Sequence, residues 1–201
     1  MNRALIALAT ALTLLLVAGL GVLGYQRFDG PAGTGPANTG LPTIGGPFAL
    51  VDGTGKTVTD QDFQGRYMLI YFGYTRCPDA CPTALNDMAV ALGKLGEEER
   101  KRVQPIFITV DPERDNGKAL SDYAAAFGPD FIGLTGTPDQ IAQVKKEFRV
   151  YSAKHPTKGG DYDMDHSSII YLMDPAGRFI ANFTQETDPD QMAQKLGSVM
   201  S

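Results

Sequence analysis

The chain has 201 residues, a formal net charge of −5 at pH 7 and 43% hydrophobic residues. Once an N-terminal segment is set aside, this length corresponds to about one domain of ordinary size. The mildly acidic balance argues against nucleic acid as the main partner, because domains that bind nucleic acid carry an excess of positive charge.

The N-terminal segment Ala4–Gly24 is almost wholly apolar and carries no charge. A run of about 20 such residues is long enough to span a bilayer as a helix. A cleaved signal peptide is the alternative, but the apolar run continues beyond the small residues Ala18–Gly21. We predict an uncleaved single-pass anchor in an inner membrane, with residues 1–3 on the inner side. The positive charge of Arg3 then places the rest of the chain in a periplasm or a mitochondrial intermembrane space.

Residues 25–47 are rich in glycine, proline, threonine and asparagine, which predicts a flexible linker. The folded domain is expected over residues 48–201. Its hydrophobic patterns predict, in chain order, a hairpin at 48–59, a helical turn at 60–63, a strand at 67–72, a helix at 83–102, a strand at 103–110, a helix at 117–127, a strand at 131–134, a helix at 138–148, a long loop or irregular hairpin at 152–165, two antiparallel strands at 168–173 and 178–183, and a closing helix at 188–199.

Strands that alternate with helices indicate an α/β domain with a mixed central sheet and helices on both faces. Both cysteines, Cys77 and Cys81, lie where the first core strand gives way to a helix. This is the layout of a thioredoxin-like domain, here with an additional N-terminal β-hairpin. Thioredoxins have two residues between their cysteines, whereas this chain has three.

The cysteine pair predicts a chemical site at this junction. Pro82 suits the first turn of a helix, so Cys81 is expected beside the helix N-terminus, where a thiol ionises more readily. Two nearby thiolates bind Cu(I) or Zn(II), or they close into a disulfide. A structural disulfide is the alternative, but a bond that encloses three residues would constrain the unfolded chain little.

The third candidate ligand is His166, which directly precedes the predicted strand at 168–173. In a thioredoxin-like fold, the turn before that strand lies opposite the cysteine turn, so an imidazole there would complete a site with two sulfurs and one nitrogen. Three such ligands satisfy Cu(I) and hold Cu(II) with a weak fourth donor, whereas structural zinc generally has four protein ligands. Asp165 is expected to orient the imidazole. His155 is expected to be a solvated loop residue.

Three stretches together resemble the Sco/SenC family of membrane-anchored copper proteins: residues 73–82, residues 110–115 and residues 165–167. The resemblance covers residues 47–201 and the anchor. It implies that Cys77, Cys81 and His166 bind copper. It also implies delivery of copper to the CuA centre of cytochrome c oxidase. The expected partners are then the CuA-bearing oxidase subunit, an upstream copper donor and a thiol reductant.

The leading hypothesis is therefore a membrane-anchored copper metallochaperone rather than an enzyme. The alternative is a thiol–disulfide oxidoreductase that reduces the cysteines of the CuA site or of another periplasmic client. In that reaction Cys77 and Cys81 would be the catalytic residues, the first attacking a client disulfide and the second resolving the mixed disulfide. A peroxidase of the peroxiredoxin type is disfavoured, because the spacing of Thr75 from Cys77 does not match the usual pattern.

Overall fold

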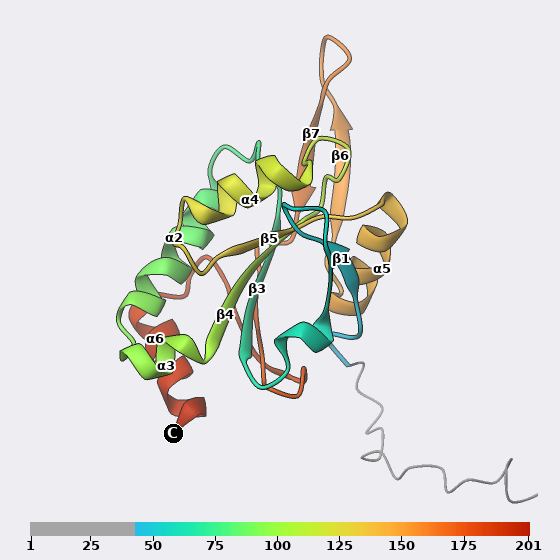
Figure 1. Cartoon of the computed structure of the whole chain (residues 1–201). Coiled ribbons are helices and arrows are strands. Elements are labelled where there is room, and N and C mark those ends of the chain that lie inside the picture. Colours follow the sequence, from blue (N-terminus) through green and yellow to red (C-terminus); the bar gives the residue numbers. More distant parts are fainter. Residues whose placement is uncertain (1–42) are drawn as a thin grey trace, which may run out of the picture. The chain divides into compact units, whose positions relative to one another are not determined.

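A five-stranded mixed sheet lies at the centre of residues 43–201, the part of the chain that the computed structural model describes (Figure 1). Its strand order is β5-β4-β3-β8-β9. Strands β3, β4 and β5 are parallel, whereas β8 is antiparallel to both β3 and β9. The strands are β3 (Tyr67–Gly73), β4 (Val103–Thr109), β5 (Ile132–Leu134), β8 (Ile170–Met173) and β9 (Phe179–Phe183). The predicted α/β class with a mixed sheet is confirmed.

The two central strands form the core because their sequences are apolar on both faces. Every residue of β3 and of β4 is buried, as is expected for parallel strands covered by helices on both sides. Figure 1 shows α2, α4 and α6 on one side of the sheet, and α5 with the β1–β2 hairpin on the other. The remaining elements are β1 (Ala49–Val51), β2 (Thr57–Thr59), the 3-10 turn η1 (Asp60–Phe63), α2 (Ala80–Gly93), α3 (Glu97–Lys101), α4 (Gly117–Ala125), α5 (Pro138–Phe148) and α6 (Pro189–Met200).

The predicted helix at 83–102 is wrong, because the structure contains two helices there. Helix α2 ends at Gly93, and α3 begins after Gly96. Glycine weakens a helix interior, and Gly96 takes the extended conformation of an N-terminal cap, where its N–H donates to Glu99 Oε2 over 3.0 Å. The break turns the chain into β4, which pairs with β3 from its first residue.

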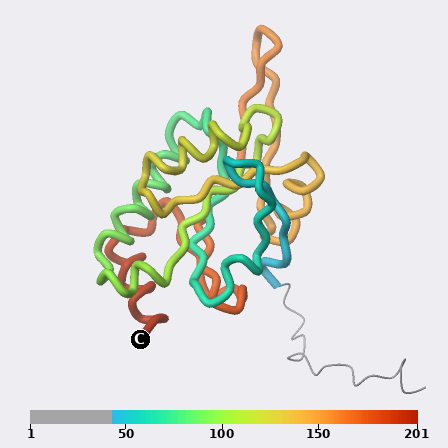
Figure 2. The backbone as a smooth tube through the Cα atoms, viewed as in Figure 1, coloured from blue at the N-terminus to red at the C-terminus, as the bar shows by residue number. Residues whose placement is uncertain are grey.

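Residues 152–165, which the sequence predicted to be either a long loop or an irregular hairpin, form a hairpin. Strands β6 (Ser152–Pro156) and β7 (Tyr162–His166) pair in antiparallel register, with Ser152 opposite His166. Figure 2 shows this hairpin extending away from the central sheet, and most of its residues are exposed. Its base therefore places His166 next to the body of the domain, while its tip reaches into solvent.

Only a small part of the predicted N-terminal anchor and linker falls within the described residues. The predicted anchor at 4–24 and most of the predicted linker lie outside the described residues. Residues 43–47, which the sequence assigned to the linker, contact the domain: Gly45 N–H donates to Glu147 O over 2.9 Å. Within residues 43–201, none of the helices has both the length and the apolar character needed to cross a bilayer.

Candidate metal centre

The two cysteines lie on either side of the start of α2. Cys77 is half-buried in the loop after β3, and Cys81, the second residue of α2, is fully buried. The Cys81 N–H donates to Cys77 Sγ over 3.3 Å, so an unpaired amide of the first helical turn faces that sulfur. Gly73 makes room for the pair, because a Cβ at this position would lie 2.6 Å from Cys81 Sγ. Gly73 therefore leaves the space that the Cys81 side chain occupies against the sheet.

The expectation that the helix N-terminus makes Cys81 more acidic is wrong. Burial raises the pKa of the Cys81 thiol well above its ordinary value, and this outweighs a hydrogen bond from the Tyr74 backbone that lowers it. Cys81 is therefore a neutral thiol in the metal-free protein at neutral pH. A metal that binds Cys81 must displace its proton, which couples binding to proton release.

His166, the last residue of β7, brings its ring to the two sulfurs. Its Nε2 lies 3.4 Å from Cys81 Sγ and 4.0 Å from Cys77 Sγ. Its Nδ1 lies 3.1 Å from the Ser167 carbonyl oxygen, which can only accept, so we assign the ring proton to Nδ1. The Nε2 lone pair then faces the sulfurs. Burial lowers the pKa of His166 below its ordinary value, so the imidazole is neutral and ready to ligate.

Two tyrosine rings fix the plane of this imidazole. Tyr71 and Tyr74 both meet His166 edge to face, with ring centroids 6.0 and 5.7 Å away. Such perpendicular contacts are favoured by the charge distribution of aromatic rings. The orientation of His166 is therefore set by β3 and by the cysteine loop, residues 74–81, as well as by its own strand.

The arrangement fits a copper ion. The sulfur atoms of Cys77 and Cys81 and a ring nitrogen of His166 all lie within 4.8 Å of one another. For ligand bonds of about 2.0–2.3 Å, a sulfur and a nitrogen sharing one ion would be about 3.6–3.8 Å apart. No fourth histidine, cysteine or acidic residue of residues 43–201 joins the cluster, and a three-ligand set of two thiolates and an imidazole suits copper better than structural zinc.

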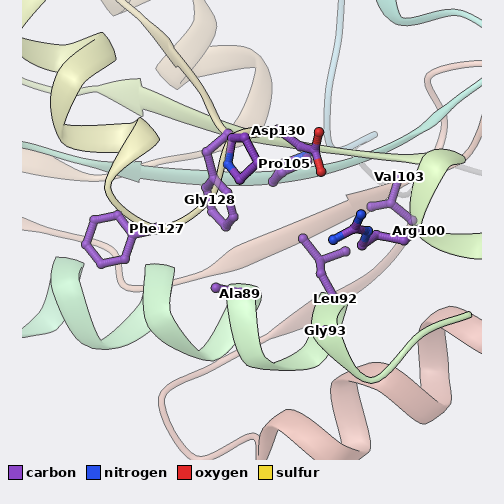
Figure 3. A pocket seen from close by; sticks show the side chains of 11 residues that line it. Ala89, Leu92, Gly93, Arg100, Val103, Pro105, Phe127, Gly128 and Asp130 are labelled. Atoms are coloured by element: carbon purple, nitrogen blue, oxygen red, sulfur yellow. The ribbon is translucent and has the colours of Figure 1, made fainter. Parts of the chain in front are cut away.

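A depression in the surface gives solvent access to the site. Cys77 and His166 line a depression of about 270 Å³ together with Tyr74, Asp79 and Met164, whereas Cys81 lies behind it. An incoming ligand would therefore meet Cys77 and His166 first. Figure 3 shows a different hollow, of about 80 Å³, near the far end of α2, where Leu92, Pro105 and Phe127 form its walls. None of its lining residues is a cysteine or a histidine.

Asp165 does not hydrogen-bond to His166 as the sequence led us to expect. Its Oδ2 lies 2.7 Å from Nε2 of His155, and both side chains are more than half exposed. Adjacent residues of a strand point to opposite faces, so Asp165 and His166 diverge, whereas Asp165 and His155 share a face of the hairpin. The Ser167 carbonyl takes the orienting role that was predicted for Asp165.

A buried carboxylate that sequence reasoning missed holds the cysteine loop. Asp115 is 1% exposed and accepts hydrogen bonds from Thr75 N (3.0 Å), Thr75 Oγ1 (2.5 Å) and Thr109 Oγ1 (2.7 Å). Thr75 lies two residues before Cys77, so these bonds tie the loop to the end of β4. Hydrogen bonds to an ionised carboxylate are among the stronger ones in proteins.

The same segment, residues 111–115, also holds the hairpin. The Tyr162 hydroxyl donates to Asp111 Oδ1 over 2.7 Å, and the Arg114 guanidinium lies 3.2 Å from the centre of the Tyr162 ring. Arg114 also donates to Tyr162 O over 2.7 Å and pairs with Asp161. The sequence singled out residues 110–115 only for their resemblance to a family. The structure shows that they anchor both halves of the site.

Comparisons with known proteins place the chain in one family. The family model described as SCO1/SenC matches residues 36–201. "Protein sco1" of Schizosaccharomyces pombe is 43% identical over 165 residues, which are 81% of this chain and 63% of that protein. The solved structure of copper-bound ScoI from Bradyrhizobium japonicum has 47% identity and a TM-score of 0.71, and the match covers 77% of this chain and 98% of that one.

A third similar protein is described by a redox property of its own. The structure of BsSco, described as having a disulfide switch and as a member of the Sco family of cytochrome c oxidase assembly proteins, is 29% identical, with a TM-score of 0.60. The match covers 79% of this chain and 94% of that one. Against the curated relatives the coverage is smaller, since the chain spans 63%, 47% and 54% of the first three.

Proposed function

The chain belongs to the SCO1/SenC family, and from this premise we propose that it binds copper through Cys77, Cys81 and His166 and passes the ion to an acceptor protein. The observation that carries the proposal is the convergence of two sulfurs and one imidazole nitrogen within 4.8 Å. The copper-bound structure of a relative at 47% identity supports the choice of metal.

Handover is supported by how unequally the three ligands are exposed. Cys81 is buried, whereas Cys77 and His166 line the open depression. A thiol of an acceptor can approach beside these two side chains and share the ion before taking it. A site with three ligands leaves room for that fourth donor, and a site closed by four protein ligands would not.

We propose the CuA centre of cytochrome c oxidase as the acceptor. The description of BsSco as belonging to a family of cytochrome c oxidase assembly proteins supports this choice. An apolar anchor at residues 4–24 would hold the domain beside a membrane-bound oxidase, with the domain facing a periplasm or an intermembrane space. The upstream copper donor and the thiol reductant remain expected partners.

A transfer assay tests the proposed function. The full-length chain in detergent, loaded with Cu(I), is mixed with a purified CuA-domain apoprotein whose cysteines are reduced, the two proteins are separated, and the copper content of each is measured. The proposal expects copper to move from the wild-type chain and not from a Cys77→Ser variant. Retention of copper by the wild-type chain, or equal transfer from both proteins, would contradict it.

Thiol–disulfide exchange is the second candidate, supported by the same exposure pattern and by the disulfide switch described for BsSco. The Cys77 thiolate would attack a client disulfide and release one client thiolate. Cys81, after losing its proton, would attack the Cys77 sulfur and release the second. The client gains two electrons, this chain ends with a Cys77–Cys81 disulfide, and a thiol reductant must restore it.

The two candidates differ in their need for His166. Reduction of a disulfide-containing CuA domain requires only the cysteines, so a His166→Ala variant should keep that activity. Copper transfer depends on all three ligands, so the same variant, which holds Cu(I) more weakly, should deliver less copper than the wild-type chain. If disulfide reduction fails and copper transfer persists undiminished after this substitution, both assignments are wrong.

A further inference from the structure

Tyr71 of β3 carries a buried hydroxyl that has no hydrogen-bond partner in the described structure. The side chain is 0% exposed, and its oxygen makes no hydrogen bond of ordinary distance and angle, although Ser168 and Cys81 lie near enough to it to influence its pKa. The ring lies nearly parallel to that of Phe107, with centroids 6.3 Å apart and an interplanar angle of 13°. Buried polar groups are nearly always paired, so an unpaired phenol beside a candidate metal site asks for an explanation.

The neighbours of this phenol are the ligands themselves. The Tyr71 ring edge and the Cys81 sulfur converge on Gly73, where an added Cβ would lie 3.1 Å from Tyr71 Cε1 and 2.6 Å from Cys81 Sγ. The ring also meets His166 edge to face. Burial raises the pKa of Tyr71, and the nearby Cys81 adds to this, which agrees with a close approach of phenol and sulfur.

The phenol lacks a strong acceptor in the metal-free protein, because a neutral thiol accepts hydrogen bonds only weakly. A metal ligand is a thiolate, whose negative charge makes it a much better acceptor. Ser168 is the other polar neighbour, but its hydroxyl is uncharged. The hydroxyl of Tyr71 therefore gains its best partner at the moment when Cys81 becomes a ligand.

We propose that the Tyr71 hydroxyl is a hydrogen-bond donor held for the Cys81 thiolate, so that it stabilises the copper-bound protein and not the copper-free one. The inference rests on the proposed function, since it requires Cys81 to be a ligand. Tyr71 is then a positioning residue that acts on copper through Cys81. Hydrogen bonds to a ligating sulfur also shift the energies of copper–thiolate transitions and the reduction potential.

The test compares Tyr71→Phe with Tyr123→Phe in the full-length chain. Tyr123 is the matched control, because its hydroxyl is also buried without a partner and its ring also packs on Phe107, with centroids 5.5 Å apart. Removing either orphaned hydroxyl should leave the copper-free protein as stable as the wild type or more stable. Only Tyr71→Phe should weaken Cu(I) affinity, by about tenfold to a hundredfold, and move the thiolate-to-Cu(II) absorption band to longer wavelength.

Equal copper affinity and an unmoved band in Tyr71→Phe and Tyr123→Phe would overturn the inference and leave the proposed function intact. A Tyr71→Phe protein that loses stability without copper would also overturn it, because the hydroxyl would then serve the copper-free fold. If the wild-type chain itself fails to bind copper, the proposed function fails and the inference fails with it. The three results are distinguishable because stability, affinity and the absorption band are measured separately.

Discussion

The cysteine loop, residues 74–81, and the β6–β7 hairpin supply ligands to the same site but are held in different ways. The loop is tied into the domain by buried Asp115, and its second cysteine is fully buried. The hairpin is mostly exposed and is anchored through Tyr162 to Asp111 and Arg114. Two sulfurs are thus fixed by the core, while the imidazole is brought in by a projecting element. Residues 111–115 connect the two.

The largest effect should come from removing the ligands that the cysteine loop and the hairpin supply. Either Cys77→Ser or Cys81→Ser should abolish binding of both Cu(I) and Cu(II), a loss greater than the roughly 10–100-fold that changing a supporting residue costs. His166→Ala should lose Cu(II) but retain weaker Cu(I) binding, because two thiolates still satisfy Cu(I). Competition with chelators for each oxidation state measures this.

His155→Ala is the matched control, because this second histidine lies on the exposed part of the hairpin. It should bind both ions like the wild type. If His166→Ala loses Cu(I) as completely as Cys77→Ser does, the expected difference between the ligands of the loop and the ligand of the hairpin does not exist.

A smaller but still large effect is expected when the anchor of the cysteine loop is removed. Asp115→Asn keeps the shape of the side chain but loses the charge and part of the acceptor capacity that Thr75 and Thr109 use. We expect a loss of about 3 kcal/mol in the free energy of unfolding, because buried donors are left poorly satisfied. Urea unfolding of the copper-free protein checks this.

Asp52→Asn provides the comparison, since Asp52 also accepts three hydrogen bonds, but in a surface turn. Its loss should stay below about 1 kcal/mol. Similar losses at both positions would mean that Asp115 is an ordinary turn residue.

The hairpin anchor should affect one oxidation state more than the other. Arg114→Lys keeps the positive charge but loses the planar group that stacks on Tyr162 and donates to its carbonyl. We expect Cu(II) affinity to fall by about tenfold, because it depends on His166, and Cu(I) affinity to change little. Arg178→Lys, at an arginine that pairs with Asp174 in a surface turn, should change neither. Equal loss of both ions from Arg114→Lys would contradict the separate anchoring of the hairpin.

The smallest effects concern pH. His166 of the hairpin and Cys81 of the cysteine loop should lower stability at opposite ends of the pH range. Because burial lowers the pKa of His166, the unfolded chain takes up a proton first as the pH falls below 6.5, and stability drops there. Because burial raises the pKa of Cys81, the unfolded chain loses a proton first above pH 9.0, and stability drops there too. Each slope is at most about 1.4 kcal/mol per pH unit.

Unfolding of the reduced, copper-free protein across pH separates the two groups. His166→Gln should remove its part of the acid loss only, and Cys81→Ser its part of the alkaline loss only. His155→Gln should leave both. An acid loss unchanged by His166→Gln would show that the imidazole does not need to be neutral in the fold.

The sequence predicted the parts of the site that depend on local signals. The apolar run of β3, the two cysteines and Pro82 lie within 16 consecutive residues and define a strand, a loop and a helix start. The acidity of Cys81 was misjudged because burial by the sheet, a tertiary effect, outweighs the helix terminus. Asp165 was misassigned to His166 because strand alternation in β7 could not be known while the segment was read as a loop or a hairpin.

The anchoring residues could not be found from local pattern. Asp115 acts on Thr75 across 40 positions of sequence, and Tyr162 acts on Asp111 across 51. The sequence did single out residues 110–115 through their family resemblance. Only the fold assigns them a physical task, which is to hold the loop and the hairpin in one place.

The central claim is that one copper ion is bound by two sulfurs from the loop and one imidazole from the hairpin. X-ray absorption spectroscopy at the copper edge of the full-length chain tests it most directly. We predict a first shell with two sulfur scatterers and the multiple-scattering pattern of one imidazole, which disappears in His166→Ala. A shell without sulfur, or an imidazole signal that survives in His166→Ala, would contradict the account.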